Sequence, residues 1–292
     1  MTLQSSSGPD LTKARANILP GHMGIYSLDA LRYYKGVVHG ISTRTAPDGS
    51  DWNLSARRGT PQHPPDPVVA LSNRGKVADA LGIELDMMVG CQQVHGAEVA
   101  VVGVADAGKG MRPGMPSIEG ADAMVTATPG LFLMVLAADC PPVFLFDPVA
   151  RAVGLAHSGW KGTAGRISGG TVAAMCREFG AQPQSIRAVI GPGVGPCCYS
   201  VGEEVVEQVE NSFPGAWVPC PTGPPLLEAK DGQIFFNLWA GIKRALLDAG
   251  VLDENIFIGD VCTAHNTATF YSHRGELGRC GLFGAVLGLR DG

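Results

Sequence analysis

Apolar runs that stop abruptly beside reactive side chains are the feature of this chain that most constrains its fold. Residues 151–156 lead into His157, which is followed at once by small, turn-forming residues. Residues 131–138 form the longest strongly apolar run, and Asp139 and Cys140 follow it before two prolines. A shorter run closes at His95 and Gly96. These patterns predict strands that end at one edge of a sheet and expose reactive groups there.

Strands and helices are mixed along the rest of the chain. Further strands are predicted over residues 143–146, 186–190, 256–259, 268–272 and 282–289, and residues 87–104 read as two strands folded about His95-Gly96. Helical spacing of apolar residues predicts helices over residues 68–81, 163–179, 201–209 and 238–249. Short connections and hairpins, without a regular βαβ alternation, favour an α/β (α+β) fold in which helices pack outside mixed β-sheets.

The length of the chain allows one large domain or two closely packed domains. A chain of 292 residues can bury roughly three-quarters of its unfolded surface without disulfides. Residues 1–22 are polar and lack a sustained period, so we expect a flexible N-terminal extension, with residues 23–292 as the catalytic domain. Residues 40–67 form a long Gly/Pro/Asp-rich connection with Arg44 and Asn53, which we expect to be either disordered or functional.

Charge and composition exclude several classes of protein. The formal net charge is −5 and no basic block occurs, which argues against nucleic-acid binding. The longest apolar run is too short to cross a bilayer, so no membrane partner is expected. Eight cysteines follow a segment with no secretory signal, which favours a reducing cytoplasm and free thiols. A monomer or a small homo-oligomer is compatible with this composition.

His95, Cys140 and His157 together match a catalytic metal site. Two imidazoles and one thiolate make a soft three-ligand set with an open position, as in catalytic rather than structural zinc sites. Each residue also has a simpler interpretation, as a hydrogen-bonded structural histidine or a small core cysteine. Their shared placement at strand ends favours the metal-site hypothesis. No short local zinc motif, such as C-x-x-C or H-E-x-x-H, supports it.

Two other motifs have both chemical and structural interpretations. Small residues after His157, together with Lys161 and Arg166, open a predicted helix and either bind an anion or form a plain glycine-rich turn. Trp160 stands where a P-loop would have its lysine, which disfavours nucleoside triphosphates. Cys197-Cys198 is a redox or metal pair or, as we favour, a turn packed under a loop, since adjacent cysteines point apart on most backbones.

Four motifs in this order resemble the YfiH/laccase-domain family. They are QVHG at residues 93–96, ADCPP at 138–142, HSGWKGT at 157–163 and IGPGVGPCCY at 190–199. The resemblance extends from about residue 37 to residue 289, and the segments around Arg44, Asn53, Arg74 and Arg279 fall where the family has similar ones. It implies a single YfiH-like α/β domain with mixed sheets. The residues after Arg44 depart from the paired glycines usual in the family.

The resemblance also implies a function. His95, Cys140 and His157 would bind Zn²⁺, and the chain would be a purine nucleoside phosphorylase that cleaves adenosine, inosine and methylthioadenosine with phosphate. Adenosine deamination, a hydrolase activity, would accompany this glycosyltransferase activity. The expected partners are therefore purine nucleosides and phosphate.

Side chains for both reactions can be nominated. For deamination, zinc would lower the pKa of water toward neutrality, and Asp139 would transfer a proton or orient a ligand histidine. For phosphorolysis, Lys161, Arg44 and Arg279 would hold the phosphate while the ribosyl carbon becomes cation-like.

Three alternatives stay open. The first is a copper-dependent polyphenol oxidase (laccase), although seven scattered histidines are few for several copper ions. In the second, a Cys140 thiolate with His157 or His95 as base makes a Cys-His hydrolase or amidase acting in peptidoglycan editing. The third is a metal-storing or partner-binding module without turnover.

Overall fold

Two six-stranded sheets form the core of the computed structural model, which describes residues 16–18, 24–220 and 223–290. The first sheet runs in the order β1 (Ala16–Ile18), β2 (Ile25–Leu28), β3 (Val37–Ser42), β15 (Phe283–Leu289), β7 (Phe132–Ala137) and β4 (Met88–Gly90). Only the β4–β7 pair in it is parallel. Because parallel and antiparallel pairs occur together, the sheet is mixed, as expected from the sequence.

The second sheet carries the strand that ends in His157. Its order is β14 (Ile256–Ile258), β10 (Arg187–Ile190), β8 (Pro142–Asp147), β9 (Ala152–His157), β6 (Ala123–Thr126) and β5 (Val99–Val101). A small third sheet contains β11 (Ser200–Val201), β13 (Gln233–Phe236) and β12 (Leu227–Lys230). Pro142 at the start of β8 pairs with His157 at the end of β9, so the turn after Cys140 lies beside this histidine.

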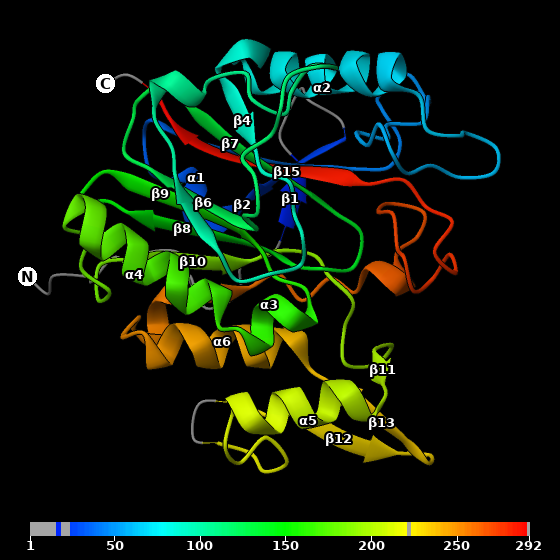
Figure 1. Ribbon diagram of the computed structural model, residues 1–292, viewed down its shortest axis with the longest axis vertical. Coiled ribbons are helices and arrows are strands. Elements are labelled where there is room, and N and C mark those ends of the chain that lie inside the picture. The colour runs from blue at the N-terminus through cyan, green and yellow to red at the C-terminus, as the bar shows by residue number, and fades with distance from the viewer. Residues whose placement is uncertain (1–15, 19–23, 221–222, 291–292) are drawn as a thin grey trace, which may run out of the picture.

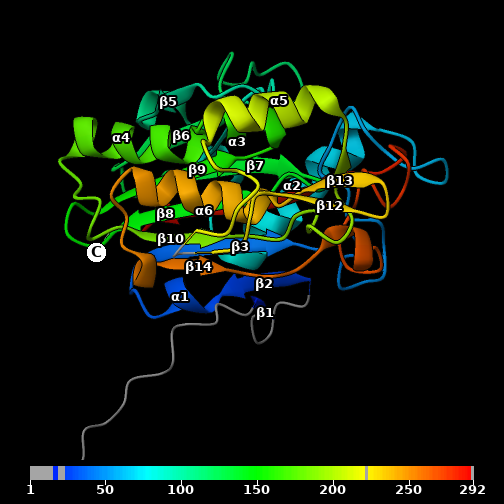
Figure 2. The ribbon, with the colours of Figure 1, turned by 90° about the horizontal axis from the view of Figure 1, so that it is seen from below.

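Helices cover the outer faces of both large sheets. Figure 1 shows α2 (Pro67–Leu81) above the first sheet, and α4 (Ile167–Phe179) and α6 (Leu238–Asp248) below the second. α5 (Glu203–Ser212) packs against α3 (Trp160–Ala164), and Figure 2 shows the two side by side. The short helices are α1 (Asp29–Arg32) and the 3-10 turns η1 (Leu85–Met87), η2 (Val104–Asp106), η3 (Asp253–Asn255) and η4 (Thr263–His265). Helices packed outside mixed sheets confirm the predicted fold class.

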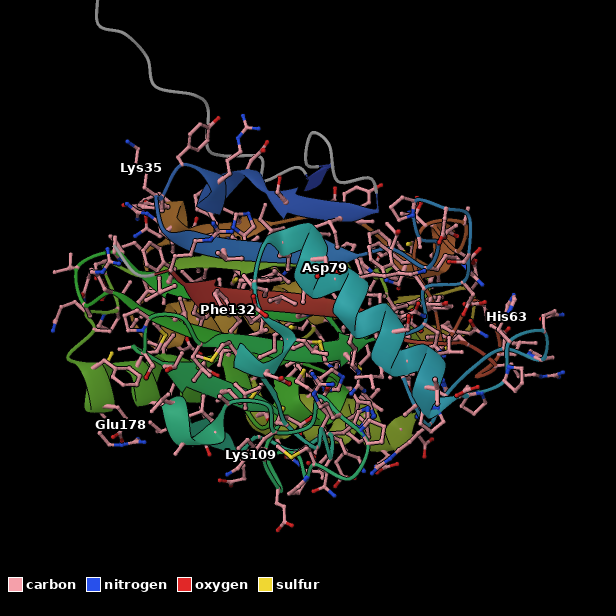
Figure 3. All side chains as sticks on the ribbon, turned by 90° about the horizontal axis from the view of Figure 1, so that it is seen from above. Lys35, His63, Asp79, Lys109, Phe132 and Glu178 are labelled. Atoms are coloured by element: carbon pink, nitrogen blue, oxygen red, sulfur yellow. The ribbon has the colours of Figure 1, made fainter. Side chains whose placement is uncertain are left out.

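Burial of both sheet faces explains the continuous apolar runs. Along β7, Leu133 and Val135 belong to the core between the sheets, whereas Phe132 and Met134 pack with residues of α2. Figure 3 shows Phe132 on the strand that lies under this helix. Because successive side chains of a strand point to opposite faces, a strand buried on both faces needs apolar residues throughout.

The predicted helix over residues 68–81 is confirmed as α2. Asp66 caps its N-terminus by accepting hydrogen bonds from the backbone N–H groups of Val68 and Val69, and Pro67 occupies the first helical position. Gly82 ends it in the left-handed conformation, with φ of 63°. A carboxylate at the N-terminus and a glycine at the C-terminus are the stabilising arrangement.

Several local predictions are wrong. Residues 163–179 do not form one helix, since α3 and α4 are separated by Arg166, which has φ of 58°. Contacts of Arg166 with Asp248 (2.7 Å) and the Phe213 ring explain the break.

Residues 268–272 form turns rather than a strand, although Phe270 and Tyr271 are buried in the core between the sheets. The pairing of residues 16–42 and 227–236 into strands was not predicted.

The strands within residues 87–104 do not pair with each other. β4 joins the first sheet beside β7, and β5 joins the second beside β6. The loop between them, which contains His95, therefore crosses from one sheet to the other.

The proposed extension, residues 1–22, lies mostly outside the described residues, and only Ala16–Ile18 are seen to pair, as β1 with β2. The domain boundary thus stays a prediction. Among the helices of the described chain, none is both long enough and apolar enough to span a membrane.

Candidate metal centre

Three segments that are distant in the sequence bring His95, Cys140 and His157 together. His157 ends β9, Cys140 follows β7, and His95 lies in the loop that crosses between the sheets. One ligand atom from each side chain lies within 4.8 Å of the other two. The two imidazole rings are 5.0 Å apart and nearly perpendicular. We call these three residues the first cluster.

A buried carboxylate that the sequence analysis did not identify holds both histidines. Asp122 accepts a hydrogen bond from His157 Nδ1 at 2.9 Å. The same carboxylate accepts hydrogen bonds from the backbone N–H groups of Val94, His95 and Gly96 at 2.8–3.0 Å. Because Nδ1 is bonded to Asp122, Nε2 of His157 is left to bind a metal.

One signal in the sequence could have identified Asp122. It directly precedes the apolar strand β6, so a reactive side chain also stands at the start of an apolar run and not only at the ends of such runs. Its exposed fraction is 0%, and a carboxylate buried so fully needs hydrogen-bond donors.

The loop around His95 is held in a costly conformation. Gln93 and His95 have φ of 57° and 62°, in the left-handed region that residues other than glycine rarely adopt. The Gln93 amide donates to the Leu136 carbonyl at 2.6 Å and accepts from the Leu136 N–H at 2.8 Å. This side chain therefore pairs with β7 as a strand backbone would, and it fixes the loop beside Cys140.

The side chains of the first cluster shift one another's pKa. Burial raises the pKa of Cys140, but the charge and hydrogen bond of His157, with help from His95, lower it to about 6. Burial lowers the pKa of His157, but Cys140 and Asp122 raise it to about 9. The pKa of Asp122 stays below its usual value despite burial, because His157 and backbone N–H groups stabilise the anion. Two anions thus surround one imidazolium.

These residues fit a soft metal ion. Thiolate and imidazole are ligands of zinc and copper, and an ion can replace the proton shared within this anionic set. Gly159 completes the surroundings, since a Cβ there would lie 2.8 Å from Cys140 Sγ and 3.4 Å from His95 Cδ2. Three ligands leave one coordination position for water or substrate, as in catalytic sites.

A cavity of about 530 Å³ lies against the first cluster, and its wall includes all three candidate ligands. Cavities that bind small molecules usually enclose about 300–1,000 Å³. Apolar side chains, including Leu71, Met111 and Met115, form part of the wall. The metal ligands therefore face a space of the size that a small organic substrate needs.

The three cations nominated for phosphate do not line this cavity within the described residues. Arg44 forms an ion pair with Glu276 at 3.1 Å and stacks on the Tyr271 ring. Lys161 is exposed and lies 5.2 Å from the centre of the Trp160 ring. Arg279 is also exposed.

Four other arginines line the cavity: Arg57, Arg58, Arg74 and Arg112. Arg74 donates to the carbonyls of Leu54, Gly110 and Met111, and Arg112 pairs with Asp86 at 2.7 Å. Arg57 and Arg58 are exposed, and the described residues place no carboxylate in an ion pair with either. The long loop over residues 40–67 thus supplies two arginines to the cavity wall.

The hydrogen bonds of Asp139 do not include a ligand histidine, which disfavours the orienting role, and its role in proton transfer stays a prediction. Its Oδ1 accepts hydrogen bonds from the hydroxyls of Thr263 (2.6 Å) and Ser272 (2.7 Å), and its Oδ2 accepts from the backbone N–H of Arg274. Asp122, and not Asp139, bonds to His157. Asp139 instead joins the C-terminal segment to the turn that carries Cys140.

Comparison with known proteins agrees with the motifs in the sequence. Residues 39–290 match a family described as multi-copper polyphenol oxidoreductase laccase. A protein of Geobacillus stearothermophilus named purine nucleoside phosphorylase YlmD is 34% identical over 259 residues, which cover 88% of this chain and 92% of that protein. A protein from an unknown prokaryotic organism, named adenosine deaminase RL5, is 32% identical over 251 residues, or 85% of this chain and 92% of that protein.

The fold is also similar to that of a solved relative. The crystal structure of YlmD from Geobacillus stearothermophilus matches with a TM-score of 0.84 and 30% identity, over 94% of this chain and 100% of that one. Most of this chain therefore shares its fold with that structure.

Proposed function

This chain belongs to the multi-copper polyphenol oxidoreductase laccase family, the YfiH/laccase-domain family of the sequence motifs, and we propose that it is a zinc-dependent purine nucleoside phosphorylase. Deamination of adenosine is proposed as a side activity. The observation that carries this proposal is a three-ligand cluster on the wall of a cavity, in a chain similar to proteins named for these two activities.

The cavity wall suits a nucleoside. Leu71, Met111 and Met115 offer apolar surface to a purine ring, and Ser55 and Gln92 offer hydrogen-bonding groups to a ribose or a base edge. We assign the phosphate to Arg57 and Arg58, because both residues line the cavity, are exposed and pair with no carboxylate of the described chain. A planar guanidinium can bind two oxygens of one phosphate.

The protein residues prepare the site for reaction. Zinc bound by His95, Cys140 and His157 would supply a Lewis acid at the cavity wall. Asp122 fixes the His157 tautomer and the His95 backbone, so both ligands are oriented before substrate binds. The two arginines would hold the phosphate anion next to the ribosyl carbon, where the negative charge of the phosphate stabilises the developing positive charge.

A cysteine hydrolase is the second candidate. Asp122 bonds to His157 Nδ1, and His157 hydrogen-bonds to Cys140, whose pKa is lowered to about 6. An acid, a histidine and a thiolate in this order are the parts of a nucleophilic triad. Bound zinc would disfavour this alternative, because a coordinated thiolate is no longer a free nucleophile.

Copper-dependent phenol oxidation is ranked lower. The His95-Cys140-His157 set resembles the ligands of a single copper ion. However, the two His/Cys clusters of the described chain contain three histidines between them, which is few for several copper ions.

Metal analysis combined with an inosine assay tests the proposal. We expect stoichiometric zinc and release of hypoxanthine that requires phosphate. Cys140→Ala should lose the release of hypoxanthine and the zinc ion of the first cluster, whereas Cys176→Ala, a control on the outer helix α4, should keep both. Full turnover in metal-free Cys140→Ala would exclude the proposal, and copper with phenol oxidation but no nucleoside cleavage would favour the oxidase.

A further inference from the structure

A second group of metal-binding side chains lies apart from the cavity. It contains Cys197, Cys198, Cys262 and His265, and one ligand atom from each lies within 4.8 Å of the other three. Cys198 Sγ is 3.1 Å from His265 Nε2, and Cys197 Sγ is 3.7 Å from His265 Nδ1. We call these four residues the second cluster.

Backbone pairing beyond the second sheet builds this cluster. β10 and β14 are parallel neighbours, and their pairing continues past both strand ends. The Gly193 N–H donates to the Val261 carbonyl at 3.1 Å, and the Thr263 N–H donates to the Gly193 carbonyl at 3.0 Å. Cys262 is therefore held against the loop that contains Cys197 and Cys198.

A tight turn directs the two adjacent cysteines to one place. The backbone N–H groups of Cys198 and Tyr199 both donate to the Gly195 carbonyl, at 3.0 and 3.1 Å. This turn corrects the expectation that the sulfurs of Cys197-Cys198 point apart, since both join the same cluster.

We propose that the second cluster is a closed zinc site with a structural role. Three thiolates and one imidazole are a common ligand set of four-coordinate structural zinc. Zinc–sulfur bonds of about 2.3 Å place tetrahedral ligands about 3.8 Å apart, so the 4.8 Å limit requires a contraction of about 1 Å at most.

The surroundings of the sulfurs support binding over simple packing. Cys197 and His265 are exposed, so they do not serve to fill the core. The Gly195 N–H donates to Cys262 Sγ at 3.3 Å, which is the kind of hydrogen bond that stabilises a thiolate ligand. A Cβ on Gly195 would lie 3.2 Å from both Cys197 Sγ and Cys262 Cβ, so a glycine keeps this space open.

An ion in the second cluster would also stabilise the turn that carries Cys140 of the first cluster. Thr263 follows Cys262 and donates its hydroxyl to Asp139, and the Val194 N–H donates to the Asp139 carbonyl at 2.8 Å. Asp139 directly precedes Cys140. Binding the two segments together at the second cluster therefore restrains the turn that carries the thiolate of the first.

Metal counting on the purified full-length chain tests the proposal. The wild type should contain about two zinc ions, one for each cluster. Cys262→Ser combined with His265→Ala should retain about one, and the control Cys176→Ser should retain about two. A wild type with one zinc ion that is lost in Cys140→Ser would overturn the proposal, as would copper in the second cluster.

A spectroscopic measurement avoids mutating the second cluster. Cobalt bound by the Cys140→Ser, His157→Ala double variant should show the intense charge-transfer absorption of several thiolates in a tetrahedral site. No such absorption, or an intact disulfide among these cysteines in mass spectra of unreduced protein, would contradict a closed metal site.

Discussion

The two His/Cys clusters differ in how many ligands they offer and in what holds them. The first has three ligands, lies on a cavity wall and is oriented by the buried carboxylate of Asp122. The second has four ligands, two of them exposed, and is held by backbone turns. Because a three-ligand ion keeps one position for substrate, its protein ligands must be oriented by their surroundings, whereas four ligands fix one another.

The pKa values of the thiols also differ between the two clusters. The pKa of Cys140 is lowered to about 6 despite its burial, because the positive charge of His157 is adjacent. Burial, together with the neighbouring sulfurs of Cys197 and Cys262, raises the pKa of Cys198 to about 12. Cys140 is thus more easily deprotonated than Cys198 before any ion binds.

Removing one thiol from each cluster should separate their roles most clearly. Cys140→Ala should lower phosphorolysis by about a thousandfold, because bound metal supplies about 4 kcal/mol of transition-state stabilisation. Cys262→Ala should lower it by less than about tenfold, because only the restraint on the Cys140 turn is lost. The check is kcat/KM for inosine at saturating phosphate. Equal losses of kcat/KM in the two variants would contradict a catalytic role for the first cluster and a structural role for the second.

Besides His157, one other histidine of the described chain is buried, and it distinguishes acid unfolding from metal loss. Unlike His157, His39 has no hydrogen-bond partner for either ring nitrogen within the described residues, and burial lowers its pKa to about 4. The unfolded chain, with a histidine pKa near 6.5, therefore binds the extra proton first as pH falls. The contribution of neutral His39 to the free energy of unfolding is therefore complete above pH 6.5. Below that pH it declines, and at pH 4 about 3 kcal/mol has been lost.

Urea unfolding of metal-free protein between pH 7 and pH 4 measures this decline. His39→Leu should remove that part of the pH dependence, and the exposed His63, which Figure 3 shows at the edge of the molecule, provides the control variant His63→Gln. An unchanged profile in His39→Leu would assign the decline to other groups.

Asp122→Asn should weaken the first cluster and leave the second intact. The amide keeps the size of the side chain but loses the negative charge opposite His157, and the loss of such a partner reduces metal affinity about 10–100-fold. Competition with a chromogenic chelator should show one weakened ion and one unchanged ion per chain. If both ions weaken equally, the two clusters are not independent.

The smallest effect is expected at the arginines of the cavity. Arg58→Ala should raise the KM for phosphate about fivefold, which corresponds to about 1 kcal/mol for a charged hydrogen bond exposed to solvent. Lys161→Ala is the matched control, because Lys161 carries the same charge but does not line the cavity. A larger increase in KM for Lys161→Ala would indicate that phosphate binds to the cations predicted from the sequence, Lys161, Arg44 and Arg279.

Local patterns were sufficient to predict much of the fold. The apolar runs predicted β7, β8 and β9, and the spacing of α2 and α6 predicted helices close to their observed bounds. Both rest on side-chain periodicity, which neighbouring residues determine. Residues 268–272 were mispredicted because Phe270 and Tyr271 are apolar but enter the core from turns.

The partners of each reactive side chain were harder to predict. Asp122 lies 35 positions from His157 in the sequence, and Cys262 lies 67 positions from the Gly195 N–H that contacts it. Neither pair leaves a local pattern. Their proximity depends on β6 pairing with β9 and on β10 pairing with β14.

The sequence by itself determined that β9 ends at His157 and that Cys140 follows the end of β7, because turn residues and apolar runs act locally. Only the tertiary structure decided that β4 and β5 join different sheets and carry His95 across to Cys140. It also decided which carboxylate orients His157 and which cations reach the cavity. These outcomes depend on pairing and packing between distant segments. The free energies of such contacts cannot be read from a short stretch of sequence.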